Sequence, residues 1–445
     1  MASTYLTRTP SSTGNATKWT LSMWVKRSKL GVQTPIISTV QSSPSNTYDE
    51  MYFNTSDKFQ FSTVYNNTQK AIRTTRVFRD VNAWYHIQFV YDTTNSTDTD
   101  HAILYINGVR ETSFEDTTLL ASGANDWESA WNKASNPMRI GYQSTNTASY
   151  FDGSMSHIHF ANNQTYAATV FGETDATTGE WKIKTSPSVT YGTNGFFILK
   201  DGNSVTDQSG NSNNFTVGGG TLTKTEDSPS NVFATMNPLS SYYFGGTFSN
   251  GNTQIVSNNS NESYATSTLG VSSGKYYWEV KNLATQNYEF IGISDRPANA
   301  TTFSAWTSSN CIGYYSRTGG YRKGSDGDFT YGNTYGQNDI IGVALDMDNS
   351  KLYFSKNGTW QNSGDPTSGA TGTGAISLYA PVDNNYFAVA GDIHVSNSTF
   401  AFNFGNGYFG TTAVSSAGTN ASGNGIFEYD VPTGYSALST KGLNL

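Results

Sequence analysis

The sequence predicts an all-β protein built from two antiparallel β-sandwich (jelly-roll) domains. Three observations predict this fold. Apolar and polar residues alternate along many short segments, turn residues separate these segments, and 14% of the residues are aromatic while only 13% are charged. Strands favour aromatic and β-branched residues, and a period of two places one strand face in a core. With 445 residues, the chain exceeds the about 250–300 residues that one core usually holds, so we expect two domains.

The first half contains alternating segments that predict strands. These segments are residues 18–26, 35–40, 50–53, 58–64, 83–91, 102–110, 138–142 and 150–160. In the first of them, Trp19 and three further apolar residues share one face while Trp24 lies on the other. Residues 50–53 and 58–64 predict a hairpin. The pair Asn107-Gly108 predicts a second hairpin, because these residues accept the positive φ angles of a type I′ turn.

Helical periodicity is nearly absent from the chain. The best candidate is residues 124–134, which we interpret as a short helix or as an aromatic loop inside an insertion. The pattern loosens over residues 165–250, where Gly218-Gly-Gly220 is typical of a turn or linker. We expect residues 176–250 to form an ordered bridge that joins the domains or completes the first one.

Alternation resumes in the second half. The predicted strands are residues 275–280, 289–294, 339–346, 351–356, 378–382, 387–390 and 399–404. A second Asn-Gly turn, Asn357-Gly358, follows the fourth of these segments. We therefore expect a first domain over residues 1–175, a second over residues 251–410, and an extended tail over residues 411–445 that packs back on a domain.

Several segments resemble two known families. The first half resembles a laminin-G-like, concanavalin A-type sandwich in the segments Trp-Thr-Leu-Ser-Met-Trp-Val (19–25), Trp-Tyr-His-Ile-Gln-Phe-Val-Tyr-Asp (84–92), Leu-Tyr-Ile-Asn-Gly-Val (104–109) and Phe-Asp-Gly-Ser-Met-Ser-His-Ile (151–158). The second half resembles a SPRY domain in Gly-Lys-Tyr-Tyr-Trp-Glu-Val (274–280), Phe-Ile-Gly-Ile-Ser (290–294), Asp-Ile-Ile-Gly-Val-Ala-Leu-Asp (339–346), Leu-Tyr-Phe-Ser-Lys-Asn-Gly (352–358) and Phe-Asn-Phe-Gly (402–405).

The whole chain also resembles structural proteins of marine bacteriophages. This resemblance rests on Asp-Gln-Ser-Gly-Asn-Ser-Asn-Asn-Phe (207–215), Phe-Ala-Thr-Met-Asn-Pro-Leu (233–239) and Pro-Thr-Gly-Tyr-Ser-Ala-Leu-Ser-Thr-Lys (432–441). It implies a virion protein whose partners are other virion proteins. The two fold families imply glycan binding by the first domain and peptide or protein binding by the second. The first hypothesis is a tail-associated adhesin that binds a host surface glycan or receptor. The alternative is a capsid or tail decoration protein with a purely structural, protein-binding role. Symmetry of a virion part further implies a homo-oligomer.

A third alternative, a glycan hydrolase, is disfavoured by the sequence. The related glucanases carry a Glu-x-Asp-x-x-Glu segment, which this chain lacks. Asp49 and Glu50 are adjacent, so on a strand they point to opposite faces. His157 and His159 are expected to share a strand face, without a third metal ligand nearby. Gly218-Gly-Gly220 is not followed by Lys-Ser/Thr, so it does not match a phosphate-binding loop. We therefore expect no enzyme and no catalytic residue.

Charge and composition narrow the partners and the location. The net charge is −8 and no basic stripe exists, so we expect no nucleic-acid binding. No segment approaches ~18 consecutive apolar residues, and the amino terminus has no signal-peptide pattern. We therefore expect no membrane insertion, synthesis in a host cytoplasm and a location in the virion. Cys311, the single cysteine, is expected to be a buried thiol.

The candidate binding residues are aromatic or cationic. In the first domain they are Trp127 and Trp131, which could stack on sugar rings. In the second domain they are Trp306, Tyr314, Tyr315, Arg317, Tyr321 and Arg322, which lie among glycines and are residue types favoured at interfaces. The laminin-G resemblance further implies a calcium ion, with Asp152 and Asn146 as candidate ligands. No other cofactor is expected.

Overall fold

The computed structural model of the protein describes residues 3–41, 44, 46–145, 149–200, 204–240, 245–258, 262–284, 286, 288–296, 311–381, 384–394 and 397–444. Strands make up 43% of the chain and helices 6%, so the predicted all-β fold is confirmed. The chain divides into two compact units, Met1–Lys224 and Thr225–Leu445. The stretch 176–250, which we expected to act as a bridge, is divided between the two units.

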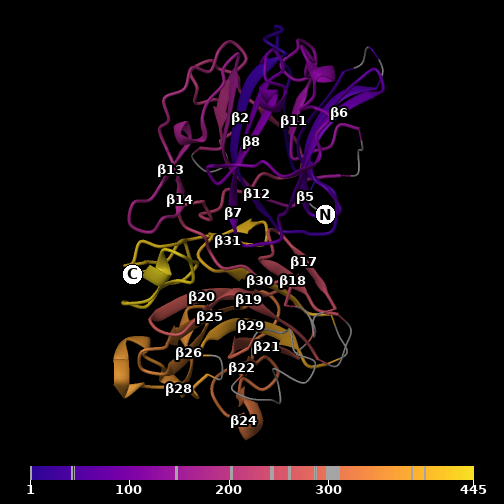
Figure 1. Ribbon diagram of the computed structural model, residues 1–445. Coiled ribbons are helices and arrows are strands. Elements are labelled where there is room, and N and C mark those ends of the chain that lie inside the picture. Colours follow the sequence, from indigo (N-terminus) through magenta and orange to yellow (C-terminus); the bar gives the residue numbers. More distant parts are fainter. Residues whose placement is uncertain are drawn as a thin grey trace. The chain divides into compact units, whose positions relative to one another are not determined.

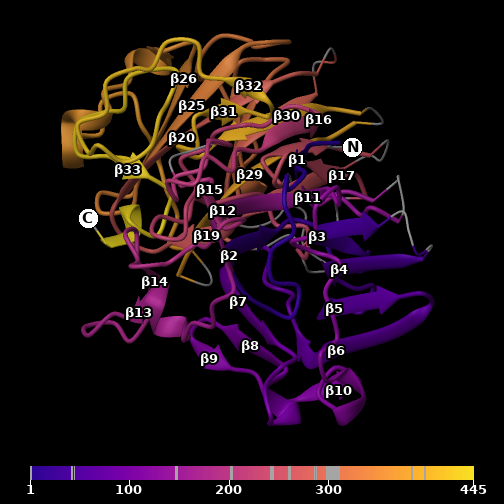
Figure 2. The same cartoon turned by 90° about the horizontal axis from the view of Figure 1, so that it is seen from above.

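The first unit contains two antiparallel sheets. The eight-stranded sheet has the order β10 (Phe114–Asp116), β6 (Thr68–Val77), β5 (Lys58–Tyr65), β4 (Thr47–Phe53), β3 (Thr34–Gln41), β11 (Met138–Ile140), β1 (Tyr5–Arg8) and β16 (Thr216–Gly219). The six-stranded sheet has the order β15 (Phe196–Ile198), β12 (Gly153–Asn162), β2 (Lys18–Arg27), β7 (Trp84–Asp92), β8 (Ala102–Ile106) and β9 (Val109–Arg110). Strands β3, β4, β5 and β6 lie side by side in Figure 2. The hairpin of β13 (Gly172–Thr174) and β14 (Trp181–Ile183) and the short 3₁₀ turns η1 (Asp98–Asp100), η2 (Ser122–Ala124) and η3 (Ala168–Val170) complete the unit.

Aromatic side chains fill the space between these sheets. Trp19 is fully buried and stacks on Tyr91, with ring centroids 4.9 Å apart and an angle of 9° between the planes. Phe61 from the other sheet meets the Trp19 ring edge-on. The hairpin predicted from Asn107-Gly108 is confirmed, because both residues have positive φ, 49° and 79°, between the paired strands β8 and β9.

The second unit also consists of two main antiparallel sheets. One is nine-stranded, with the order β17 (Thr247–Ser249), β18 (Gln254–Val256), β30 (Thr399–Asn403), β20 (Lys275–Asn282), β25 (Ile340–Asp346), β26 (Lys351–Lys356) and β27 (Thr359–Trp360), plus β28 (Ile376–Ser377) on β26 and β33 (Ser436–Ala437) on β20. The other has the order β19 (Ser263–Val271), β29 (Tyr386–Asp392), β21 (Glu289–Ser294), β22 (Ile312–Tyr315), β23 (Tyr321–Lys323) and β24 (Asp328–Phe329). Figure 1 shows β20 and β25 in one layer and β29, β21 and β22 in the other. The remaining elements are the pair β31 (Tyr408–Phe409) and β32 (Thr412–Ala413) and the 3₁₀ turns η4 (Gly324–Asp326), η5 (Gln361–Ser363), η6 (Pro366–Thr371) and η7 (Gly442–Asn444).

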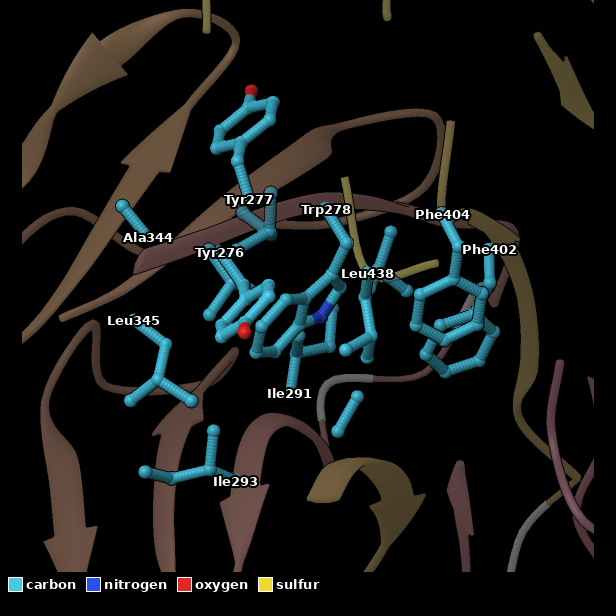
Figure 3. Packing of buried hydrophobic residues seen from close by; sticks show 14 of the residues in the cluster. Tyr276, Tyr277, Trp278, Ile291, Ile293, Ala344, Leu345, Phe402, Phe404 and Leu438 are labelled. Atoms are coloured by element: carbon cyan, nitrogen blue, oxygen red, sulfur yellow. The ribbon is translucent and has the colours of Figure 1, made fainter. Parts of the chain in front are cut away.

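Alternation along β20 explains how this unit buries both faces of one sheet. Trp278 lies between the two layers near Ile291 and Phe402, whereas Tyr277 points to the opposite face (Figure 3). That opposite face is covered by the C-terminal segment, where Phe427 packs on Tyr277 with ring centroids 5.1 Å apart. Residues 411–444 are therefore part of the second unit's packing and of its nine-stranded sheet, through β33.

The structure decides one local alternative and corrects one local prediction. Residues 124–134 form no helix: η2 ends at Ala124 and turns follow, so the loop interpretation holds. His157 and His159 do not share an undisturbed strand face, because a β-bulge between Ser156 and His159 gives His157 a φ of 48°. A bulge leaves no signal in the alternation of apolar residues and cannot be predicted from it.

Candidate functional site

One partly exposed aromatic cluster contains the predicted site residue Trp127. Trp127 is half-buried in the loop after η2, Tyr65 is 47% exposed at the end of β5, and their rings meet edge-on with centroids 6.4 Å apart. The Lys70 ammonium group of β6 lies 5.7 Å from the centre of the Trp127 ring. We call Trp127, Tyr65 and Lys70 the Trp127 ledge.

The ledge is held rigidly by the β-sandwich beneath it. The indole Nε1 of Trp127 donates to Thr63 Oγ1 at 3.1 Å, and its backbone carbonyl accepts from Tyr91 and Thr93, each at 2.8 Å. Because the N–H is used internally, the exposed part of the ring presents carbon atoms. Such a surface suits apolar packing against a ligand rather than hydrogen bonding.

Trp131 does not contribute to this surface, which corrects its prediction as a ligand-binding residue. Its side chain is 1% exposed and its ring lies 4.9 Å from Trp19 in the core. The buried carboxylate of Asp49 holds this loop against the core. It accepts hydrogen bonds from Ser129 Oγ at 2.5 Å and from the Trp131 N–H at 3.0 Å. Burial raises the pKa of Asp49 to about 6, against the opposing effect of these hydrogen bonds.

Sequence reasoning missed Tyr65 and Lys70, which complete the ledge. Tyr65 ends an apolar strand and precedes Asn66-Asn67, both with positive φ, so it stands beside a tight turn. An aromatic residue at a hairpin end is the only local signal for it. Its meeting with Trp127 spans about sixty residues of sequence, which no local pattern encodes.

In the second unit the structure separates the predicted residues. Arg317 is exposed, and its guanidinium carbon lies 5.3 Å from the centre of the Tyr288 ring. Tyr288 stacks on the exposed His394, with centroids 4.1 Å apart and an angle of 15°. We call these three residues the Tyr288 stack. Tyr315 is half-buried beside Arg317, whose charge opposes the rise that burial causes in the pKa of Tyr315.

The other predicted residues of this unit lie elsewhere. Tyr314 is fully buried and donates to the Asn333 carbonyl, so its prediction as a binding residue is wrong. Tyr321 stacks on Phe329 with centroids 5.0 Å apart, and Arg322 donates to Asp328 at 3.1 Å. Trp306 lies outside the described residues.

The candidate metal ligands do not form a site in the part of the chain that the structure describes. Asn146 lies outside it, and Asp152, half-buried, accepts from the Ser28 N–H through its backbone carbonyl. Within the described ranges, no three His, Cys, Asp or Glu side chains are grouped to hold a metal ion. The calcium ion stays a prediction. His159 is buried, and burial lowers its pKa, so its neutral ring packs on Phe197 at 3.8 Å.

The adjacent carboxylates of β4 serve different loops. Asp49 binds the loop of Trp131, whereas Glu50 accepts from Gln143 at 3.0 Å on the other face of the strand.

Cys311 is buried, as expected, and burial raises its pKa well above the usual value. Across the described residues, no helix is long and apolar enough to cross a membrane.

Comparison with known proteins matches a segment of each unit to a family model. Residues 2–171 match the model of the concanavalin A-like lectin/glucanases superfamily, and residues 275–382 match the model of the SPRY domain. No curated protein matches the chain.

The similar solved structures include two SPRY domains and a pentraxin. The SPRY domain of human HERC1 is 18% identical, covering 38% of this chain and 96% of that chain at a TM-score of 0.30. A human SPRY domain is 14% identical, and the match covers 34% of this chain and 90% of that chain at a TM-score of 0.24. The heptameric SAP-like pentraxin of Limulus polyphemus is 14% identical, and the match covers 37% of this chain and 71% of that chain at a TM-score of 0.28.

Lectin-like and SPRY domains are typically binding domains without catalytic activity. The chain thus contains a concanavalin A-like domain of the lectin/glucanases superfamily over residues 2–171, followed by a SPRY domain over residues 275–382.

Proposed function

We propose that this protein is a virion component of a bacterial virus whose concanavalin A-like domain binds a glycan on the host surface, without cleaving it. The observation that carries the proposal is the Trp127 ledge. It presents indole carbons at a position fixed by hydrogen bonds from the indole N–H and to the backbone carbonyl of the same residue.

The chemistry around the ledge fits a sugar. The C–H face of a pyranose ring packs on aromatic carbons, and its hydroxyls need donors and acceptors at the rim. Asn66 and Asn67 are exposed directly after Tyr65 and supply amide groups. Lys70 adds a cation that also favours the ring face. A loop already held in place binds with a smaller loss of conformational entropy.

A glycan array with the full chain tests this proposal. Host-derived polysaccharides should bind the native protein, and Trp127→Ala should weaken binding about tenfold or more, which is about 1.4 kcal/mol. Trp127→Phe should retain most of it, because the aromatic surface remains. Phe329→Ala removes an exposed aromatic side chain from the SPRY domain and serves as the matched control.

The array result also has a clear contrary outcome. Equal binding by the native protein and Trp127→Ala would show that the Trp127 ledge does not contribute to glycan binding. Silence of the native protein across all host glycans would refute the adhesin proposal itself.

The second candidate function is a capsid or tail decoration protein that binds other virion proteins. The Tyr288 stack favours it, since aromatic and arginine side chains that lie together and partly exposed are typical of protein interfaces. Immunogold labelling of intact particles separates the two candidates. Loss of the label in Arg317→Ala particles but not in Trp127→Ala particles supports decoration, and labelling at the tail tip supports the adhesin.

A further inference from the structure

An open pocket of about 400 Å³ lies where β1 ends and β16 begins, at one edge of the eight-stranded sheet. Its lining residues carry only hydroxyl, amide and guanidinium side chains: Thr7, Arg8, Thr9, Ser11, Ser212, Asn213, Asn214 and Thr216. The volume falls in the usual range of small-molecule sites, about 300–1,000 Å³. The Trp127 ledge lies near β5 and β6, toward the opposite edge of the same sheet. The pocket is therefore a separate place on the domain.

One wall of the pocket is the polar loop over residues 207–215, and a buried carboxylate organises it. Asp207 is 8% exposed and accepts from the N–H groups of Phe197, Ser209 and Asn213, each at 2.8 Å. The Asn213 amide in turn donates to the Gly195 carbonyl at 2.8 Å. These bonds fix the loop, so that its residues 212–214 face the pocket in a defined arrangement.

Arg8 is the charged residue in the lining. Its guanidinium donates to the Asn194 carbonyl at 3.3 Å and to Asn213 Oδ1 at 2.5 Å, and both acceptors are neutral. The nearby Asp207 carboxylate is occupied by its own loop, and Arg8 forms no ion pair within the described ranges. A guanidinium has five N–H donors, so three remain for a ligand.

We propose that this pocket binds a sugar residue that carries a carboxylate, such as a uronic acid unit of an acidic polysaccharide. The guanidinium of Arg8 pairs with the carboxylate, because its planar donors match the two oxygens. The surrounding hydroxyls and amides match the hydroxyls of the sugar ring. The lining contains no aromatic or aliphatic side chain, which disfavours nucleobases and lipids. This proposal does not rest on the Trp127 ledge.

Isothermal titration of the full chain with methyl β-D-glucuronide tests the inference. Methyl β-D-glucoside is the neutral counterpart, and sodium phosphate is the non-sugar anion. The glucuronide should bind about tenfold more tightly than either, which corresponds to about 1.4 kcal/mol.

Three variants locate the binding. Arg8→Gln should raise the Kd for the glucuronide about tenfold. Ser212→Asp adds a repelling carboxylate at the rim, and its φ of 60° is one that aspartate accepts, so folding is retained. It should weaken binding by a similar factor even if Arg8→Gln misfolds. Arg110→Gln also removes one positive charge, from an exposed residue paired with Asp100, and should leave the Kd unchanged.

Each contrary result bears on a distinct part of the inference. Equal affinity for the glucuronide and the glucoside would overturn the carboxylate assignment, and equal affinity for phosphate would reduce the pocket to a general anion site. Binding that survives both Arg8→Gln and Ser212→Asp would place the ligand elsewhere. Because Trp127→Ala leaves this pocket intact, its effect on array binding reports separately on the proposed glycan ledge.

Discussion

The carboxylate of Glu279 should make the stability of the SPRY domain fall as pH rises. Glu279 lies on β20, is fully buried, and accepts from the N–H groups of Glu428 at 2.9 Å and Tyr429 at 2.8 Å. Asn403 and Tyr277 donate to it as well, at 3.2 and 3.1 Å. This one side chain therefore anchors the C-terminal segment to the sheet.

Burial raises the pKa of Glu279 from 4.5 to about 7, against the opposing effect of these hydrogen bonds. The folded domain therefore holds a proton that the unfolded chain releases near pH 4.5. The contribution to stability is fully present below pH 4.5 and is lost as pH rises through 7. Between pH 5 and pH 8, this loss amounts to roughly 2–3 kcal/mol, since each tenfold change in proton affinity is worth about 1.4 kcal/mol.

Denaturant unfolding at pH 5 and pH 8 measures this effect, with hydrogen exchange in residues 275–282 reporting on the SPRY domain alone. Glu279→Gln cannot titrate and should lose the extra 2–3 kcal/mol of pH dependence, whereas Asp49→Asn in the other domain should keep it. The same pH dependence in the native protein and in Glu279→Gln would refute the reasoning.

Three further predictions follow from the packing. Gly218→Ala would place a Cβ 2.2 Å from the Tyr5 ring and should destabilise the first domain by about 1–3 kcal/mol in thermal unfolding; an unchanged Tm would contradict this contact. Trp181→Phe removes the Nε1 donation to His86 Nδ1 at 3.0 Å. It should cost about 1 kcal/mol and shift the nitrogen resonances of His86, a ring that burial keeps neutral with a pKa of about 3; unshifted resonances would show that the bond is absent. Deletion of residues 411–445 should leave the SPRY domain unfolded by circular dichroism, and a native-like spectrum would show that this segment is dispensable.

Much of the fold could be predicted from local pattern, because strand alternation and turn chemistry are local. Both Asn-Gly pairs adopt the positive φ angles that a type I′ turn requires, including Asn357 at 48° and Gly358 at 78°. Trp24 lies on the strand face opposite Trp19, as alternation predicts, and stacks on His86 with centroids 4.9 Å apart.

The sites were harder to predict, because they depend on contacts between distant residues. Trp127 and Trp131 lie four residues apart in one loop, and contacts with distant residues distinguish them: Asp49 holds the buried Trp131, whereas Thr63 holds the half-buried Trp127. The glycines at 218–220 were expected to form a turn or linker. Gly218 instead lies in the edge strand β16, against the Tyr5 ring. Arg8 meets its pocket wall across about two hundred residues of sequence.

The most direct test of the account is competition for adsorption to host cells. Purified protein at saturating concentration should block attachment of the virus particle, and Trp127→Ala should block it about tenfold less effectively at equal concentration. Undiminished particle attachment in the presence of the native protein, or equal blocking by the two forms, would contradict host glycan recognition through this ledge.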